Sequence, residues 1–151
     1  MERLRPPPFC KPHVIIEREG KSIAIFGLIT PDTPVLTHPK NVVGLTFLDP
    51  IETAAELVPK LQPKADVIIA LTHIGYNMDR QLGEEVGGIN VIVGGHSHAM
   101  ISVPERLGTS GGNAIIRPCP YLCCFHKLCS VQVSASFSVS VFSAHIVASR
   151  F

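Results

Sequence analysis

Three histidines could bind a metal ion, judging by their spacing and their glycine neighbours. His96 and His98 directly follow a Gly-Gly pair, and His73 lies twenty-three residues before His96. Neutral imidazole is the commonest protein ligand for transition metals. In extended backbone, side chains two positions apart face the same way, so His96 and His98 would present both rings to one side. We therefore take all three histidines as candidate metal ligands.

Glycines stand next to these histidines. Gly94 and Gly95 precede His96, and Gly75 follows His73 closely. Glycine lacks side-chain bulk and tolerates unusual backbone angles, so the chain can pass close to a metal or a phosphate group. We expect the three glycines to form a loop on the phosphate side of the site. No catalytic residue is identified, because nothing around the serines suggests a nucleophile with its base.

The order of the expected elements brings the histidines together. Residues 67–71 are an uninterrupted apolar run of the kind found in strands covered on both faces, and 89–93 are expected to be the next buried strand. A short helix is expected between them over 78–86, and strand–helix–strand order favours parallel pairing with a right-handed crossover. Parallel strands end at the same edge of a sheet, which is where α/β sites form. Residues 72–75 and 94–98 should therefore meet there.

The part of the chain before residue 67 should complete the sheet and add a second helix. Strands over 13–16 and 22–28 flank a glycine-containing turn, as in a hairpin. Asp49 followed by proline is a helix start, and the apolar spacing carries this helix to about residue 61. Pro59 should bend the helix or end it early. The fold class predicted is α/β, with a largely parallel sheet and covering helices.

The histidine motifs resemble those of a known family. Residues 71–75 (Leu-Thr-His-Ile-Gly) and 91–98 (Val-Ile-Val-Gly-Gly-His-Ser-His) resemble the last two metal-binding motifs of the calcineurin-like metallophosphoesterases, in particular of the 5′-nucleotidase branch. Residues 26–33 and 41–50 are similar to further segments of that branch. The resemblance implies a partial layered fold of this family, with residues 11–117 forming the C-terminal half of its catalytic domain.

The resemblance also implies roles for the histidines. His73 and His96 match positions that bind one metal of a pair, and His98 matches a position that contributes to the other. Two such ions activate a water and stabilise the charge that develops on phosphorus. Imidazole and carboxylate ligands suit Zn, Mn or Fe, among which the sequence does not choose. The implied activity is metal-dependent hydrolysis of phosphate monoesters, with nucleoside 5′-monophosphates as the expected substrates.

The earlier motifs of the family are missing from this sequence. It contains no Asp-x-His and no Gly-Asp, and its one Gly-Asn pair is followed by Ala114. Two cations held close together need a bridging carboxylate to offset their repulsion. We therefore expect an incomplete metal site and a chain that is inactive or weakly active alone.

Two alternatives to an enzyme stay open. The chain could be a non-catalytic fragment that binds one metal, or a partner through apolar surface that the missing half would cover. A plain nucleotide-binding α/β module ranks last, because no Gly-x-Gly-x-x-Gly or P-loop motif is present.

The composition changes near residue 118. Every acidic residue lies at or before Glu105, and Lys127 and Arg150 are the only charged residues from 118 to 151. We treat 118–151 as an atypical Cys/Ser-rich tail. Alternating apolar residues over 131–141 predict a strand that can join a sheet edge. Its crowded cysteines lack the standard spacing of zinc sites.

Charge and hydropathy narrow the range of partners. A formal charge of +1 gives no electrostatic reason to expect nucleic acid or an anionic membrane. No apolar run reaches the roughly 18 residues that a spanning helix needs. The first residues show no signal peptide, whereas members of the resembled family are often secreted or on the cell surface, so the compartment is left open.

Overall fold

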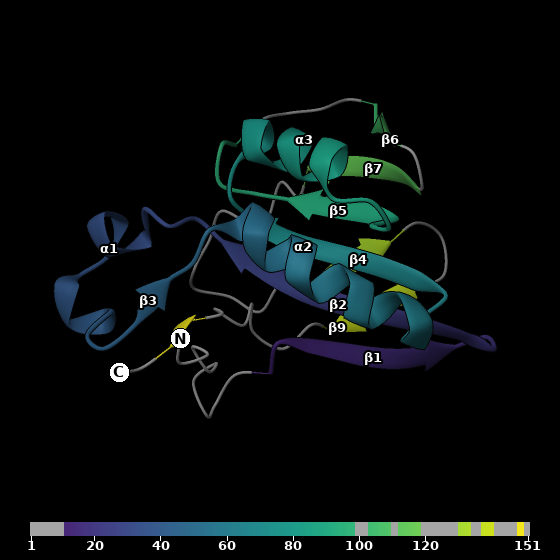
Figure 1. Cartoon of the computed structure of the whole chain (residues 1–151), viewed down its shortest axis with the longest axis horizontal. Coiled ribbons are helices and arrows are strands. Elements are labelled where there is room, and N and C mark those ends of the chain that lie inside the picture. Colours follow the sequence, from purple (N-terminus) through teal and green to yellow (C-terminus); the bar gives the residue numbers. More distant parts are fainter. Residues whose placement is uncertain are drawn as a thin grey trace.

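A six-stranded, largely parallel sheet is the frame of the molecule (Figure 1). The computed structural model describes residues 11–98, 103–109, 112–118, 130–133, 137–140 and 148–149. The strand order is β1-β2-β4-β5-β7-β6. Neighbours from β2 through β4 and β5 to β7 pair in parallel, whereas β1 and β6 are antiparallel edges. The strands are β1 (His13–Arg18), β2 (Lys21–Ile29), β4 (Val67–His73), β5 (Val91–Gly94), β6 (Glu105–Thr109) and β7 (Gly112–Pro118).

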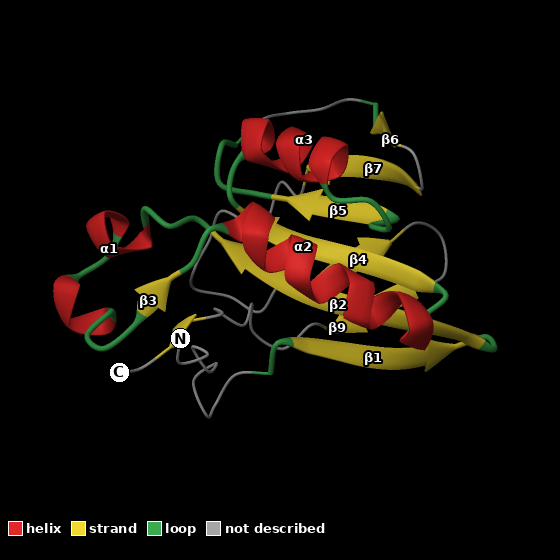
Figure 2. Cartoon of the chain, in the orientation of Figure 1, coloured by secondary structure: helices red, strands yellow, loops and turns green. Residues whose placement is uncertain are grey.

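Two helices, α2 (Pro50–Leu61) and α3 (Tyr76–Glu85), lie on the same face of this sheet (Figure 2). Asp49 starts α2 as expected: its Oδ1 accepts hydrogen bonds from two backbone N–H groups of the first turn, at 2.8 and 2.9 Å. The helix runs to Leu61, as the apolar spacing predicts, and passes Pro59, so of the two effects expected of this proline the early end was wrong. Pro59 stands in the last turn, where it removes one backbone hydrogen bond while the buried face of the helix still packs.

The main core lies between the two helices and the sheet. Apolar side chains from β2, β4, β5 and both helices meet there and exclude water, which is the largest favourable contribution to folding. The predicted α/β fold with covering helices is thereby confirmed. The fully buried members include Ala24, Ala54, Val58, Leu61, Ala70, Leu82, Ile89 and Ile92.

The opposite face of the sheet is also apolar. Ile25, Leu71 and Val93 are buried there, one from each of three neighbouring strands. Partly buried apolar side chains surround them, namely those of Ile16, Ile23, Ile69 and Val91. Central parallel strands with apolar residues on both faces are typical of sheets that are covered on both sides.

Between β2 and α2 the chain leaves the sheet and forms a small excursion (Figure 1). It contains α1 (Thr33–Leu36), a 3₁₀ turn at Pro39–Asn41 and β3 (Thr46–Phe47), with which β10 (Ala148–Ser149) pairs. A second 3₁₀ turn, Gln62–Lys64, follows α2.

The described part of the tail does not extend the six-stranded sheet. β8 (Ser130–Val133) and β9 (Phe137–Ser140) pair with each other in a sheet of their own. The tail cysteines lie outside the described residues. Within the part of the chain that is described, no helix has the length and hydropathy to cross a bilayer.

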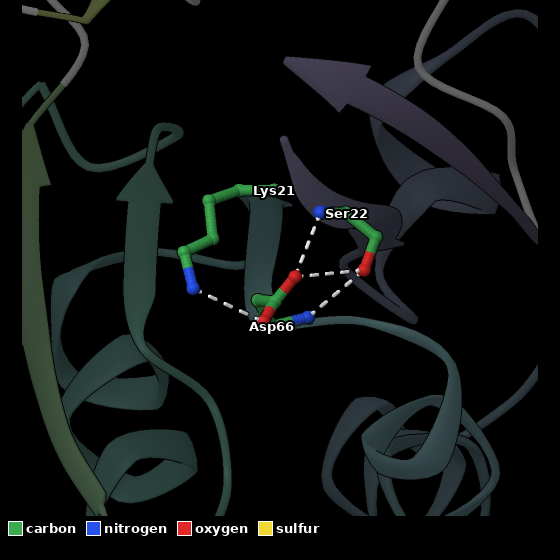
Figure 3. A network of polar contacts seen from close by, with 3 residues as sticks. All are labelled: Lys21, Ser22 and Asp66. Atoms are coloured by element: carbon green, nitrogen blue, oxygen red, sulfur yellow. Dashed lines mark hydrogen bonds and ion pairs between the residues drawn. The ribbon is translucent and has the colours of Figure 1, made fainter. Parts of the chain in front are cut away.

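A polar cluster ties the starts of β2 and β4 together (Figure 3). The Asp66 carboxylate accepts hydrogen bonds from the Ser22 N–H at 2.9 Å and the Ser22 hydroxyl at 3.0 Å, and Lys21 approaches it at 3.4 Å. The Asp66 N–H donates back to the Ser22 carbonyl at 2.8 Å. These bonds hold the parallel register that places Ile29, at the end of β2, beside His73.

Candidate metal centre

The carboxyl ends of β2, β4 and β5 meet at one edge of the sheet, as the strand order predicts. The arrowheads of β2 and β5 point to the left in Figure 1, toward the side where α1 lies. The Thr30 N–H donates to the His73 carbonyl at 3.1 Å, which joins the ends of β2 and β4. The Tyr76 N–H donates to the Ser97 hydroxyl at 3.1 Å, which joins the loops after β4 and β5.

His73 and His96 lie next to each other at this edge of the sheet, where the parallel strands end. Their ring centres are 5.0 Å apart, and the rings meet edge to face at 69°. Metal–nitrogen bonds of about 2.0–2.1 Å bring the ring centres of two imidazoles on one ion to about 5 Å from each other. The separation of the two rings therefore suits binding of a single metal ion.

The surroundings of His73 favour its neutral form. Partial burial lowers the pKa of His73 below its usual value, and the charges of His96 and His98 lower it further. A metal ligand must be a neutral imidazole, so this effect favours binding. His96 is half-buried, whereas His98 is exposed.

The backbone of the histidine loop is not extended. His96 has a φ of +81° and His98 a φ of +53°, so the expectation of extended backbone at these two residues was wrong. β5 ends at Gly94, and beyond it the Ser97 N–H donates to the Gly95 carbonyl at 3.2 Å. This bond closes a three-residue turn around His96, a strained conformation for a residue with a side chain.

The glycines of the site have different neighbours. Gly75 has a φ of +90° and begins α3, and a Cβ there would lie 3.5 Å from Cδ2 of the His96 ring. A Cβ on Gly94 would overlap the carboxylate of Asp79. The group that lies against the Gly94 backbone is thus a protein side chain, that of Asp79. Gly95 supplies the carbonyl that closes the turn around His96.

Asp79 is a buried carboxyl group that the sequence analysis missed. It is 2% exposed, and its Oδ1 accepts a hydrogen bond from the Thr72 hydroxyl at 2.5 Å. Burial raises the pKa of Asp79 to about 7, although the Thr72 hydrogen bond acts in the opposite direction. A signal existed: Asp79, Leu82 and Val86 are spaced like the buried stripe of a helix.

A second polar contact holds the start of α3. The Tyr76 hydroxyl donates to Oε2 of Glu105 in β6 at 2.6 Å, and Arg80 lies 3.4 Å from Oε1 of the same carboxylate. The hydrogen bond to Glu105 raises the pKa of Tyr76. The helix is thereby linked to the far edge of the sheet.

The described residues fit part of a metal centre. Among them, no group of three or more His, Cys, Asp or Glu side chains is arranged to hold a metal ion. What the edge does provide is the imidazole pair of His73 and His96, with His98 nearby. Imidazole donors of this kind suit transition-metal ions.

Proteins similar to this chain include a nucleotide phosphoesterase and a 5′-nucleotidase. No family profile matches the sequence. The chain is 41% identical over 96 residues to the trifunctional nucleotide phosphoesterase protein YfkN of Bacillus subtilis, covering 62% of this chain and 6% of that protein. It is 34% identical over 101 residues to a 5′-nucleotidase of Vibrio cholerae, covering 58% of this chain and 18% of that protein. The chain thus spans less than a fifth of either relative.

Solved structures give the same result at the level of the fold. A 5′-nucleotidase precursor from Thermus thermophilus matches with a TM-score of 0.56 and 28% identity, over 71% of this chain and 24% of that one. A calcineurin-like phosphoesterase, YfkN from Bacillus subtilis, matches with a TM-score of 0.56 and 26% identity, over 70% of this chain and 40% of that one.

Proposed function

Because the chain resembles the 5′-nucleotidase branch of the calcineurin-like metallophosphoesterases in sequence and in fold, we propose that it takes part in metal-dependent hydrolysis of phosphate monoesters. The observation that carries this proposal is the His73–His96 ring pair at the carboxyl edge of the sheet. Nucleoside 5′-monophosphates are the proposed substrates, since similar proteins are a nucleotide phosphoesterase and a 5′-nucleotidase.

The histidines have separate roles in this proposal. His73 and His96 bind one divalent ion through neutral imidazoles, and His98 contributes to a second. When bound, such ions activate a water and polarise the phosphoryl group. Gly75 and Gly95 keep the loop free of side chains beside the phosphate, whereas Gly94, which we expected to share this role, makes room for the Asp79 carboxylate. Burial of the edge favours the neutral form of His73, which a ligand requires.

We propose further that residues 11–117 are one half of a catalytic domain and that 118–151 are a tail of different origin. The sequence contains no Asp-x-His and no Gly-Asp motif to supply a bridging carboxylate. A dinuclear centre without that carboxylate is opposed by repulsion between its cations. The chain alone is then inactive or weakly active, and the remaining ligands come from another polypeptide segment.

Metal stoichiometry and nucleotide hydrolysis, measured on the same preparation, test this proposal. We expect the full chain to bind at most one Zn²⁺ or Mn²⁺ by titration calorimetry and to release little phosphate from AMP. Binding should be lost in His73→Ala and in His96→Ala. His38→Ala is the matched control, because His38 is an exposed histidine of the excursion whose Nδ1 already accepts a hydrogen bond from the Lys40 N–H at 3.2 Å. If the chain binds two ions and its turnover is abolished by His96→Ala, the claim that the chain alone is inactive is refuted. If it binds no ion at all, the assignment of the histidines as metal ligands is refuted.

A second candidate function is binding of a protein partner without catalysis. The observation in its favour is the apolar face opposite the helices, where Ile16, Ile23, Ile69 and Val91 are only partly buried. Apolar patches beyond a few hundred Å² favour association. Sedimentation of the purified chain tests this: concentration-dependent association that Ile69→Ser reduces would support it, and a monomer at all concentrations would count against it.

A further inference from the structure

The carboxyl group of Asp79, in α3, contacts β4 and β5 at the edge of the sheet where the histidines lie. Asp79 belongs to the first turns of α3, and its backbone N–H donates to the Gly75 carbonyl at 2.9 Å. Its side chain accepts the hydrogen bond of Thr72 in β4 and abuts Gly94 in β5. Thr72 directly precedes His73, and Gly94 lies two residues before His96. The carboxyl group therefore touches both strands immediately ahead of the two histidines.

Packing alone does not account for an acidic residue at this position. Asp79 is 2% exposed, and burying a carboxyl group is unfavourable unless its oxygens find hydrogen-bond partners. An apolar side chain would fill the same space without that cost. Gly94, moreover, has room for the carboxylate only because it lacks a Cβ. Asp79 in α3 and Gly94 in β5 are thus complementary in shape, because the carboxylate fills the space that a Cβ at position 94 would occupy.

We propose that Asp79 is a positioning residue that sets the separation of the His73 and His96 imidazoles. On one side, the carboxyl group accepts the hydrogen bond of the Thr72 hydroxyl. On the other side, it occupies the space that a side chain at position 94 would need. The ends of β4 and β5 are thereby held at one spacing, and the ring pair is prepared before any ion arrives. The metal-binding part of this proposal rests on the proposed function, whereas the spacing of the rings does not.

The first measurement needs no metal. Rings whose centres are 5.0 Å apart give a nuclear Overhauser effect (NOE) between His73 and His96 in the metal-free chain. We expect this signal to be lost in Asp79→Ala and kept in Asp79→Asn, because the amide oxygen can still accept from Thr72. Zn²⁺ affinity should fall roughly 10-fold in Asp79→Ala, as is usual when a residue that orients ligands is removed. The Asn variant should bind as the unsubstituted chain does.

Leu82→Ala is the matched control. Leu82 is 0% exposed and lies on the same helix, so its truncation lowers the melting temperature while the Asp79 carboxylate keeps both its Thr72 hydrogen bond and its place against Gly94. It should leave the ring–ring signal and Zn²⁺ affinity unchanged. If Asp79→Ala also lowers only the melting temperature, Asp79 is merely structural and the positioning role is refuted.

A reciprocal substitution keeps the test decisive should Asp79→Ala fail to fold. Gly94→Ala places a methyl group against the carboxylate and should also abolish the ring–ring signal. Combining it with Asp79→Ser removes the overlap and should restore the signal, so the two changes are not additive. If the losses of the ring–ring signal caused by the two substitutions simply add, the shape complementarity of Asp79 and Gly94 is refuted. If the unsubstituted chain shows the ring–ring signal but binds no Zn²⁺, the proposed function fails while the positioning role is still decided by the NOE measurements.

Discussion

At the scale of single residues, the backbone of His96 can be tested apart from its ring. With a φ of +81°, His96 is held where a side chain is unfavourable by about 1–2 kcal/mol and where glycine is not. We expect His96→Gly to be more stable than His96→Ala by about 1 kcal/mol, although both lack the imidazole. Urea unfolding of the two variants measures this difference. Equal stabilities would mean that the turn around His96 is not strained.

Asp79 makes a prediction about pH. Burial raises its pKa to about 7 from an ordinary value of 3.8, so the folded chain holds a proton that the unfolded chain has released between these values. Stability should therefore fall as the pH rises from about 4 to above 7, by up to about 4 kcal/mol. Asp79→Asn cannot ionise and should lack this part of the pH dependence. Urea midpoints at several pH values compare the two chains, and parallel curves would contradict a raised pKa.

At the scale of elements, the features best predicted from the sequence are those that depend on a pattern over many residues. The apolar runs located β4 and β5, and Asp49 with its proline located the start of α2. The rule that parallel strands end at one edge brought His73 and His96 together correctly. The separate expectation of extended backbone failed beyond Gly94, because the chain there leaves the sheet and its backbone angles are set by a local turn.

Asp79 was missed for a related reason. Acidic residues are almost always on the surface, so an aspartate in a predicted helix is taken as solvent-facing unless a partner is known. The partner, Thr72, is supplied by tertiary packing of α3 on β4. Only the placement of Asp79 in the same stripe as Leu82 hinted at burial.

The cluster at the start of β2 and β4 supports a prediction about these elements. Hydrogen bonds from the Ser22 backbone and hydroxyl, followed by that from Lys21, lower the pKa of Asp66 below 3.8. The stability they confer is therefore present above that value and lost as the pH falls through the lowered pKa. Asp66→Asn should lower the melting temperature at pH 7 and flatten its acid dependence. Lys21→Ala is the control and should have a smaller effect, since Lys21 is largely exposed and 3.4 Å away.

At the scale of the whole molecule, the two faces of the sheet should contribute unequally to stability. Ile92 is fully buried under the helices, whereas Ile69 is partly buried on the opposite face. Truncating a buried isoleucine costs about 2–5 kcal/mol because a cavity remains. We expect Ile92→Ala to lose that much in urea unfolding and Ile69→Ala clearly less, since water already reaches the second side chain. Equal losses would show that the opposite face is as well covered in solution as the helix side, which would remove the reason to expect a partner there.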